Sequence, residues 1–98
     1  MNKQQKILQV SNPSEAQKKL NKYIGKPTKL LLSTRKEKKY MVNDGNKFIH
    51  FGDINAQDYT KHKDDKRRAS YLARAKGIKG DWKNNKYSAN NLAINVLW

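Results

Sequence analysis

A tight-turn signature between two β-prone runs constrains the fold of this chain more than any other feature. Asn-Asp-Gly-Asn occupies residues 43–46, and Asp-Gly tolerates the positive φ angles that tight hairpin turns need. The runs on either side, residues 39–42 and 47–51, are short and carry aromatic and β-branched side chains. A third β-prone run covers residues 28–34. The centre of the chain therefore predicts a three-stranded antiparallel meander.

Helix signals stand on both sides of this meander. Before it, Asn12 is a suitable N-cap, Pro13 takes the first helical position, Glu15 can complete a capping box, and Gly25 ends the pattern. After it, Gly52 is expected to end the sheet and residues 53–63 to form a loop, and a helix is expected to begin at residue 64 or 65 and to stop at Gly77. Ser88 is expected to cap a short last helix. The predicted class is α+β: a small three-stranded antiparallel meander with an N-terminal helix, a basic amphipathic helix and a short C-terminal helix.

Length and composition limit the chain to one small domain. It has 98 residues, of which 36% are hydrophobic, so a large core is not expected. Residues 1–11 are polar and basic, with Ile7, Leu8 and Val10 as their main apolar side chains, and predict a basic N-terminal arm. Residues 12–98 are expected to form a single α+β domain.

Charge points to the kind of partner. The formal net charge is +14, concentrated in residues 1–40 and 58–98. Such an excess favours contact with a polyanion: nucleic acid, an anionic membrane surface or an acidic protein. The chain has no cysteine, which excludes disulfides and thiolate metal sites, and no apolar run approaches the roughly 20 residues of a membrane span.

The basic helix is amphipathic on a helical wheel. Tyr71, Leu72, Ala75 and Ala69 cluster on one side, which is expected to pack. Lys66, Arg67, Ser70 and Arg74 cluster on the opposite side. The candidate polyanion-binding or partner-binding residues are Lys63, Lys66, Arg67, Arg74, Lys76 and Lys79, and the aromatic residues that could stack on bases are Tyr59, Trp82 and Tyr87.

Catalytic chemistry finds little support in the pattern. His50 and His62 each have aspartates nearby in the sequence, but their spacing matches no metal motif, so no metal and no cofactor are expected. Ser70 has no base at helical spacing. We expect no enzyme activity and no small-molecule substrate. A small nuclease that uses His50, His62 and the aspartates is the remaining enzymatic hypothesis.

A series of short motifs runs through the second half of the chain: His-Phe-Gly at residues 50–52, Asp-Tyr-Thr-Lys-His-Lys-Asp at 58–64, Arg-Arg at 67–68, Tyr-Leu-Ala-Arg at 71–74 and Leu-Trp at 97–98. Over residues 38–98 this series resembles a family of small basic proteins of uncharacterised function from large DNA viruses and bacteriophages. The resemblance implies a viral origin and a virion component. It implies no catalytic activity.

The motif residues also have a structural interpretation. Thr60 and Asp64 can satisfy backbone amides, His62 can tie the loop to the sheet, and the arginines can pair with Asp58 and Asp53. This interpretation is favoured over a catalytic one, because no activating geometry is evident. The motif residues given this structural role are His50, Asp58, Tyr59, Thr60, His62, Asp64, Arg68, Tyr71 and Trp98.

Two functions follow as expectations. The first is a minor capsid or virion protein that docks onto capsid or other virion proteins through its basic surface, located in the virion and, during assembly, in the host cell. The alternative is a non-specific nucleic-acid-binding protein of a virus or phage, which contacts viral DNA through its phosphates.

Overall fold

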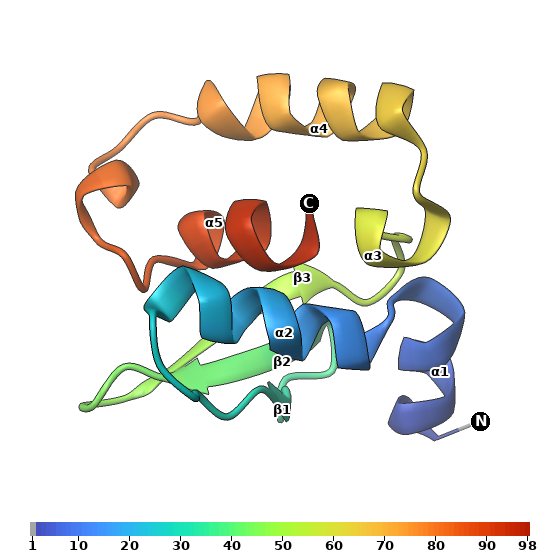
Figure 1. Ribbon diagram of the computed structural model, residues 1–98, viewed down its shortest axis with the longest axis horizontal. Helices are drawn as coiled ribbons and strands as arrows, with labels where there is room; N and C mark the ends of the chain where they lie inside the picture. Colours follow the sequence, from blue (N-terminus) through green and yellow to red (C-terminus); the bar gives the residue numbers. More distant parts are fainter. Residues whose placement is uncertain (1) are drawn as a thin grey trace.

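The sheet of the protein is an antiparallel meander in the order β1-β2-β3, as predicted (Figure 1). The computed structural model describes residues 2–98. Strand β1 is Leu31–Leu32, β2 is Lys38–Asn43 and β3 is Phe48–Asp53. Strand β1 is shorter than the expected run of residues 28–34. The amides of Thr28 and Leu30 instead donate to side chains of the preceding helix, at 2.9 and 3.0 Å.

The β2–β3 turn follows the predicted chemistry. The Asp44 amide donates to the Lys47 carbonyl at 3.0 Å, and the Asp44 carboxylate accepts from the amides of Asn46 and Lys47 at 2.8 and 2.9 Å. These backbone hydrogen bonds, that from Asn46 first, lower the pKa of the Asp44 carboxyl. Gly45 has a φ of +103°, which only glycine adopts without strain. Asp-Gly at this position therefore fixes the register of the central hairpin.

Residues 3–10 differ from the expected basic arm. They form helix α1, Lys3–Val10, with Asn2 and Gln5 making a capping box at its start. Ile7 is fully buried in the hydrophobic core and Val10 is nearly so. Two apolar side chains three positions apart fall on one helical face, which is enough to dock a helix onto an existing core. Met1, also part of the expected arm, lies outside the described residues.

Helix α2 is Pro13–Ile24. Asn12 is its N-cap and Gly25 is its C-cap, as predicted. The predicted capping box is wrong, although the Asn12 side chain does accept from the Glu15 amide at 3.3 Å. The Asn12 amide donates instead to the Thr60 hydroxyl at 2.9 Å, and the Glu15 carboxylate binds Lys63. Partners from a distant segment displace the local reciprocal bond.

The second half of the chain is helical. Helix α3, Tyr59–His62, lies where a loop was expected, and helix α4, Asp65–Lys76, follows with Asp64 as its N-cap. A 3₁₀ turn η1, Trp82–Asn84, leads to helix α5, Ala89–Leu92, which is capped by Ser88 as predicted. Helix α5 continues as the π-helical segment η2, Ala93–Leu97.

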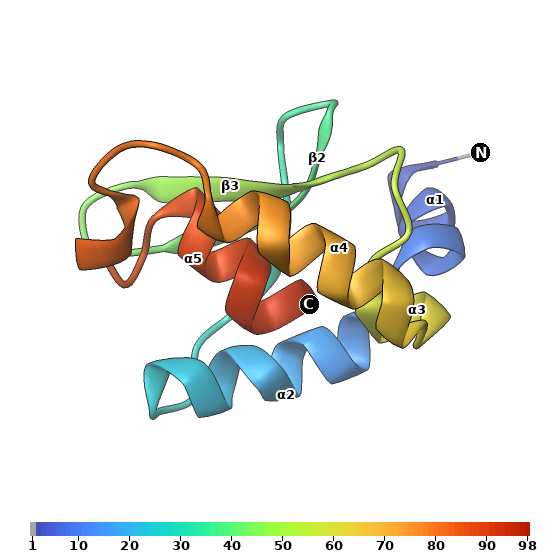
Figure 2. The same cartoon turned by 90° about the horizontal axis from the view of Figure 1, so that it is seen from above.

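The helices are arranged in two tiers over the sheet. Helix α5 packs against β3 and α2 packs against η2, whereas α4 runs along the outer edge of the molecule beyond α5 (Figures 1 and 2). The core lies in the first tier and is formed by Ile7, Ala16, Leu20, Tyr40, Val42, Phe51, Leu92, Ala93, Val96 and Leu97. Of the residues of α4, only Ala75 is buried. Helix α4 is therefore placed outside the main core.

Gly52 allows the C-terminal helix to approach the sheet. It lies inside β3 with a φ of +85°, so it does not end the sheet as expected from the sequence. A Cβ at this position would lie 2.9 Å from Leu97 Cδ1 and 3.1 Å from Lys39 Cβ. The absence of a side chain at residue 52 thus permits the contact between β3 and η2.

We predict that Gly52→Ala destabilises the protein more than Gly45→Ala. Both glycines have a left-handed φ, which costs an alanine about 1–2 kcal/mol. Only residue 52 adds a steric conflict, because a Cβ at residue 45 meets nothing within 4 Å. Overpacking typically adds about 1–3 kcal/mol. Urea unfolding of the two variants measures the difference, and equal losses would contradict the close approach.

Candidate functional site

The motif at residues 58–64 is built around a buried ion pair. Lys39 Nζ lies 3.1 Å from Asp58 Oδ2, and the two side chains are 2% and 0% exposed. The other carboxylate oxygen of Asp58 accepts from the Thr60 amide at 3.0 Å and from the Thr60 hydroxyl. Burial lowers the pKa of Lys39, and the adjacent Asp58 opposes that change. The expected pairing of Asp58 with an arginine is wrong, because β2 brings a lysine to it inside the protein.

A directed row of hydroxyls extends this ion pair. Because the Thr60 hydroxyl donates to Asp58, it accepts from the Ser11 hydroxyl, at 3.2 Å. Ser11 in turn accepts from the Tyr40 hydroxyl at 2.7 Å. Burial raises the pKa of Tyr40 to about 12, which keeps this phenol a donor. All members are buried, and we call this set the polar network: Ser11, Lys39, Tyr40, Asp58 and Thr60.

An aromatic cluster holds the start of α4. The Tyr71 and Trp98 rings stack with centroids 4.2 Å apart and 11° between their planes, and the His62 ring lies 5.1 Å from Trp98. Tyr59 meets the His62 ring edge-on at 5.9 Å. Arg68 Nε donates to the main-chain oxygen of Trp98 at 2.7 Å. We call Tyr59, His62, Tyr71 and Trp98 the aromatic clasp.

The two histidines lie on different elements. His50, on β3, has its Nδ1 atom 2.6 Å from the Ser33 hydroxyl. His62 contacts Tyr59 and Trp98 within the clasp and does not tie the loop to the sheet, and its Nδ1 accepts from the Asp64 amide at 2.9 Å. Within residues 2–98, no group of three or more His, Asp or Glu side chains is arranged to hold a metal ion.

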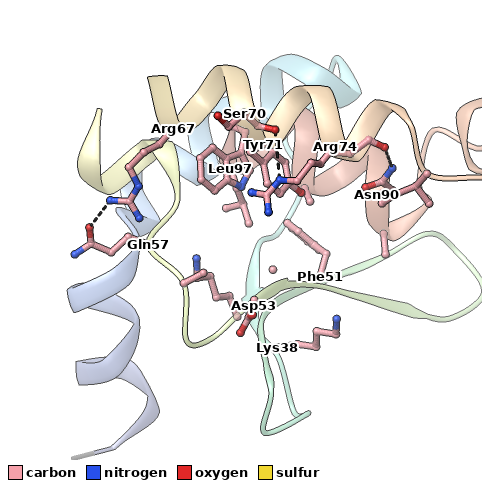
Figure 3. Close-up of a pocket in the computed structure, with 18 of the residues that line it drawn as sticks. Lys38, Phe51, Asp53, Gln57, Arg67, Ser70, Tyr71, Arg74, Asn90 and Leu97 are labelled. Carbon is pink, nitrogen blue, oxygen red and sulfur yellow. Dashed lines mark hydrogen bonds between the residues drawn. The ribbon is translucent and has the colours of Figure 1, made fainter. Parts of the chain in front are cut away.

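The cations of α4 line a hollow between this helix and the sheet. Five of the twelve residues of α4 are Lys or Arg. In Figure 3, Arg67 extends toward Gln57 and Arg74 lies along α4 beside Ser70, while Lys38 and Asp53 lie on the strand side of the hollow. The first hollow has a volume of about 840 Å³. Its charged lining is Lys38, Lys39, Asp53, Lys66, Arg67 and Arg74, and its apolar and aromatic lining includes Phe51, Tyr71, Ile78, Leu97 and Trp98.

A second hollow lies on the other flank of α4. It has a volume of about 440 Å³ and separates α4 from α5 and η1. Its lining is Arg68, Leu72, Lys76, Trp82, Lys83, Asn91, Ile94 and Asn95, without an acidic side chain among them. Cations therefore lie on both sides of α4.

The structure groups the predicted cations only in part. Lys66, Arg67 and Arg74 share the first hollow, and Lys76 belongs to the second. Lys63 binds Glu15 and stays half exposed, and Lys79 is exposed in the loop after α4.

Sequence reasoning missed Lys38 and Lys83 as lining residues. No local signal marks them, because they come from β2 and η1, and only the fold brings these elements beside α4.

The predicted faces of α4 need correction. Ala75 is buried and Tyr71 and Leu72 are half-buried, but Ala69, expected on the packing side, is exposed. The side with Lys66, Arg67, Ser70 and Arg74 is not simply outward, since these residues line the first hollow. The expected arginine–Asp53 pair does not form either. Arg67 donates to Gln57 at 3.5 Å, and Arg68 Nε donates to Trp98. A helical wheel gives the direction of each side chain around the helix axis, but it does not show which directions are covered by the rest of the protein. Helix α4 contacts the protein only along a narrow strip of its surface.

The candidate stacking residues have partners within the protein. Trp82 Nε1 donates to the Ile78 carbonyl at 2.7 Å, Tyr87 packs against the core, and the Tyr59 hydroxyl donates to Asp65 at 2.8 Å. Tyr59 also carries the guanidinium of Arg68 over its ring, at 5.4 Å from the centroid. These contacts explain how the aromatic side chains are held.

Part of the chain matches a protein-family model. Residues 28–75 match DUF5754, a family of unknown function. The matched segment begins before β1 and ends inside α4, so it includes the meander, the motif at residues 58–64 and most of the basic helix. No curated protein and no solved structure matches the chain. The viral origin stays a prediction.

Acid is expected to weaken the fold through His62. Burial lowers the pKa of His62, and the charged groups that act on it are Arg67, Asp64, Asp58 and Lys39. Protonation at Nδ1 would also break the hydrogen bond from the Asp64 amide. The unfolded chain takes up this proton more readily, so stability is complete above about pH 6.5 and is lost as the pH falls from there toward the folded pKa.

We therefore predict a flatter pH dependence of stability for His62→Gln than for the wild type. Urea unfolding between about pH 7.5 and 5.5 measures it, a range that brackets the ordinary histidine pKa. His50→Gln serves as a comparison, because burial lowers the pKa of His50 as well. If His62→Gln keeps the full wild-type slope, the argument for His62 is wrong.

Proposed function

We propose that this chain is a non-catalytic binding protein whose cationic surface around α4 holds a polyanion, with nucleic acid as the principal ligand. The observation that carries the proposal is the arrangement of cations along both flanks of one exposed helix. A helix outside the core needs no such charge for packing. The formal net charge of +14 adds long-range attraction to any polyanion.

The geometry favours phosphate contacts over chemistry on a substrate. Arg67 and Arg74 are both exposed on α4. An arginine side chain can donate two parallel N–H hydrogen bonds to the oxygens of one phosphate. The motif at residues 58–64 serves the interior, because both carboxylate oxygens of Asp58 accept from protein donors. The proposal therefore assigns the exposed bases to binding and the buried Asp58 to folding, and it includes no reaction.

The matched test replaces two cations of the first hollow. Arg67→Gln with Arg74→Gln should weaken binding to DNA, and the slope of log affinity against log salt should fall by about 2, since each lost phosphate contact removes about 0.9. The control is Lys26→Gln with Lys47→Gln, two exposed lysines at loop positions before β1 and in the β2–β3 turn. Both doubles carry the same net charge.

Fluorescence anisotropy across a salt series reports both quantities. Equal losses in the two doubles would show that net charge alone attracts DNA, and would contradict a site at α4. Absence of DNA binding by the wild type at about 50 mM salt, where phosphate contacts are strong, would contradict the proposal as a whole.

A second candidate function is a minor virion component that docks onto another protein. It is supported by the resemblance of residues 38–98 and by exposed apolar side chains away from α4. Leu8 on α1, Leu32 on β1 and Phe48 on β3 are 53, 38 and 43% exposed. Helix α1 and strand β1 lie on the opposite side of the molecule from α4 (Figure 1). Single exposed apolar residues are common, so contact of these three side chains with a partner has to be tested directly.

For this second candidate, the expected result is that the chain co-purifies with virus or phage particles and cross-links to a capsid protein through residues near Leu8 or Phe48. Mass spectrometry of purified particles measures both. Absence from particles, together with abundance in the soluble fraction of the producing cell, would remove the virion assignment.

A further inference from the structure

Helix α4 forms a ridge between two hollows. Figure 1 shows it along the outer edge of the molecule, and Figure 2 shows it running alongside α5 when seen from above. Ala75 marks the side that faces the protein, since it is 3% exposed. Ala69 and Ala73 are exposed and line neither hollow. These two alanines are four residues apart and share one helical face, and we call them the crest of α4.

The two flanks of this ridge carry cations from different turns of the helix. Arg67 and Arg74 line the first hollow, and Arg68 and Lys76 line the second. Lys38 on β2 adds a cation to the far wall of the first hollow, and Lys83 on η1 adds one to the far wall of the second. Each hollow therefore has a cation on both of its walls, and the far wall of the first hollow also carries Asp53.

The acidic residues at the start of α4 have partners within the protein. Asp64 accepts from the amides of Lys66 and Arg67 at 3.0 and 3.2 Å. Asp65 accepts from the Tyr59 hydroxyl at 2.8 Å. Asp53 is the one acid among the described residues that line the hollows, and it lies on β3, away from the ridge. An anion beside α4 meets predominantly positive charge.

From this arrangement we propose that the ligand is duplex nucleic acid that straddles α4, with the helix in the major groove and one phosphate backbone in each hollow. This inference rests on the proposed function and names its ligand. The major groove is about 12 Å wide and admits an α-helix of about 10–12 Å diameter. Small crest side chains let the helix axis approach the base edges, and cations on both flanks meet both backbones. A single strand has one backbone and fills one hollow.

The crest also determines whether the protein can recognise a base sequence. Ala69 and Ala73 offer no side-chain donor or acceptor, so they cannot distinguish base pairs by hydrogen bonds. The flanking cations contact phosphates, which carry no sequence information. The duplex is therefore bound at any sequence.

The decisive experiment compares single substitutions on the two flanks. Fluorescence anisotropy measures affinity for a duplex of about 20 base pairs and for one of its strands, over a salt series. Arg74→Gln and Lys76→Gln should each lower duplex affinity and reduce the salt slope by about 1, as expected for one phosphate contact. For the single strand, only one of the two substitutions should have this effect. Lys47→Gln is the control of equal charge.

A second pair of variants tests the crest. Ala73→Glu should lower duplex affinity at least about tenfold relative to Gln4→Glu, because a like charge against a polyanion at the interface is strongly disfavoured. Both substitutions change the net charge equally, and both positions are exposed on helices. Thermal melting checks that each variant remains folded.

The outcomes separate the ligand from the function. If Lys76→Gln or Ala73→Glu weakens duplex binding no more than its control, the straddling geometry is wrong, while polyanion binding through the first hollow stands. If the single strand binds as tightly as the duplex and responds to both flanks alike, the duplex assignment is wrong. If neither the duplex nor the single strand binds at about 50 mM salt, both the proposed function and the inference of a duplex ligand are wrong.

Discussion

The ion pair between Lys39 and Asp58 is the interaction on which the rest of the structure depends. It joins β2 to α3 in the interior, and Thr60 extends it to the junction of α1 and α2 through Ser11 and the Asn12 amide. Burying two charges is costly, and removing one partner of such a pair typically costs about 3–5 kcal/mol, because the other charge stays buried. The row of hydroxyls lowers the cost of burying Asp58, because the Thr60 hydroxyl donates to the carboxylate oxygen that Lys39 does not bind. A small chain with few apolar residues thus gains a defined centre.

The position of α4 follows from this centre. Asp58 is the N-cap of α3, α3 leads directly into α4, and the aromatic clasp fixes the first turns of α4 to Trp98. Beyond this clasp the helix has little burial, so its remaining side chains face solvent or the two hollows. The buried charges and the exposed charges therefore have different roles. Asp58 organises the fold, and the exposed cations of α4 are the side chains that we propose bind the ligand.

Local rules predicted the local parts of this structure. Asp-Gly in the turn, Asn12 and Ser88 as N-caps, and Gly77 after α4 depend on neighbouring backbone groups, so the sequence indicates them directly. The errors involve distant partners. Glu15 binds Lys63 instead of its own helix start, Asp58 pairs with Lys39 instead of an arginine, and Ile7 docks α1 onto a core formed elsewhere.

The same reason limits prediction of the site. The sequence identified the cations of α4, because their helical spacing is visible. It could not show that Lys38 and Lys83 complete the hollows, since strand pairing and the path of the last loop bring them there. A helical wheel also could not reveal a ridge, which depends on how far α4 stands from the sheet.

Native-state hydrogen exchange tests the central claim most directly: the polar network is the rigid centre and α4 is a ridge outside it. The Asn12 and Thr60 amides, which donate to the Thr60 hydroxyl and the Asp58 carboxylate, are predicted to exchange only through global unfolding. Amides in the middle of α4 are predicted to exchange through local opening at a lower free energy. If the Asn12 and Thr60 amides exchange as readily as those of α4, the polar network does not hold the fold together.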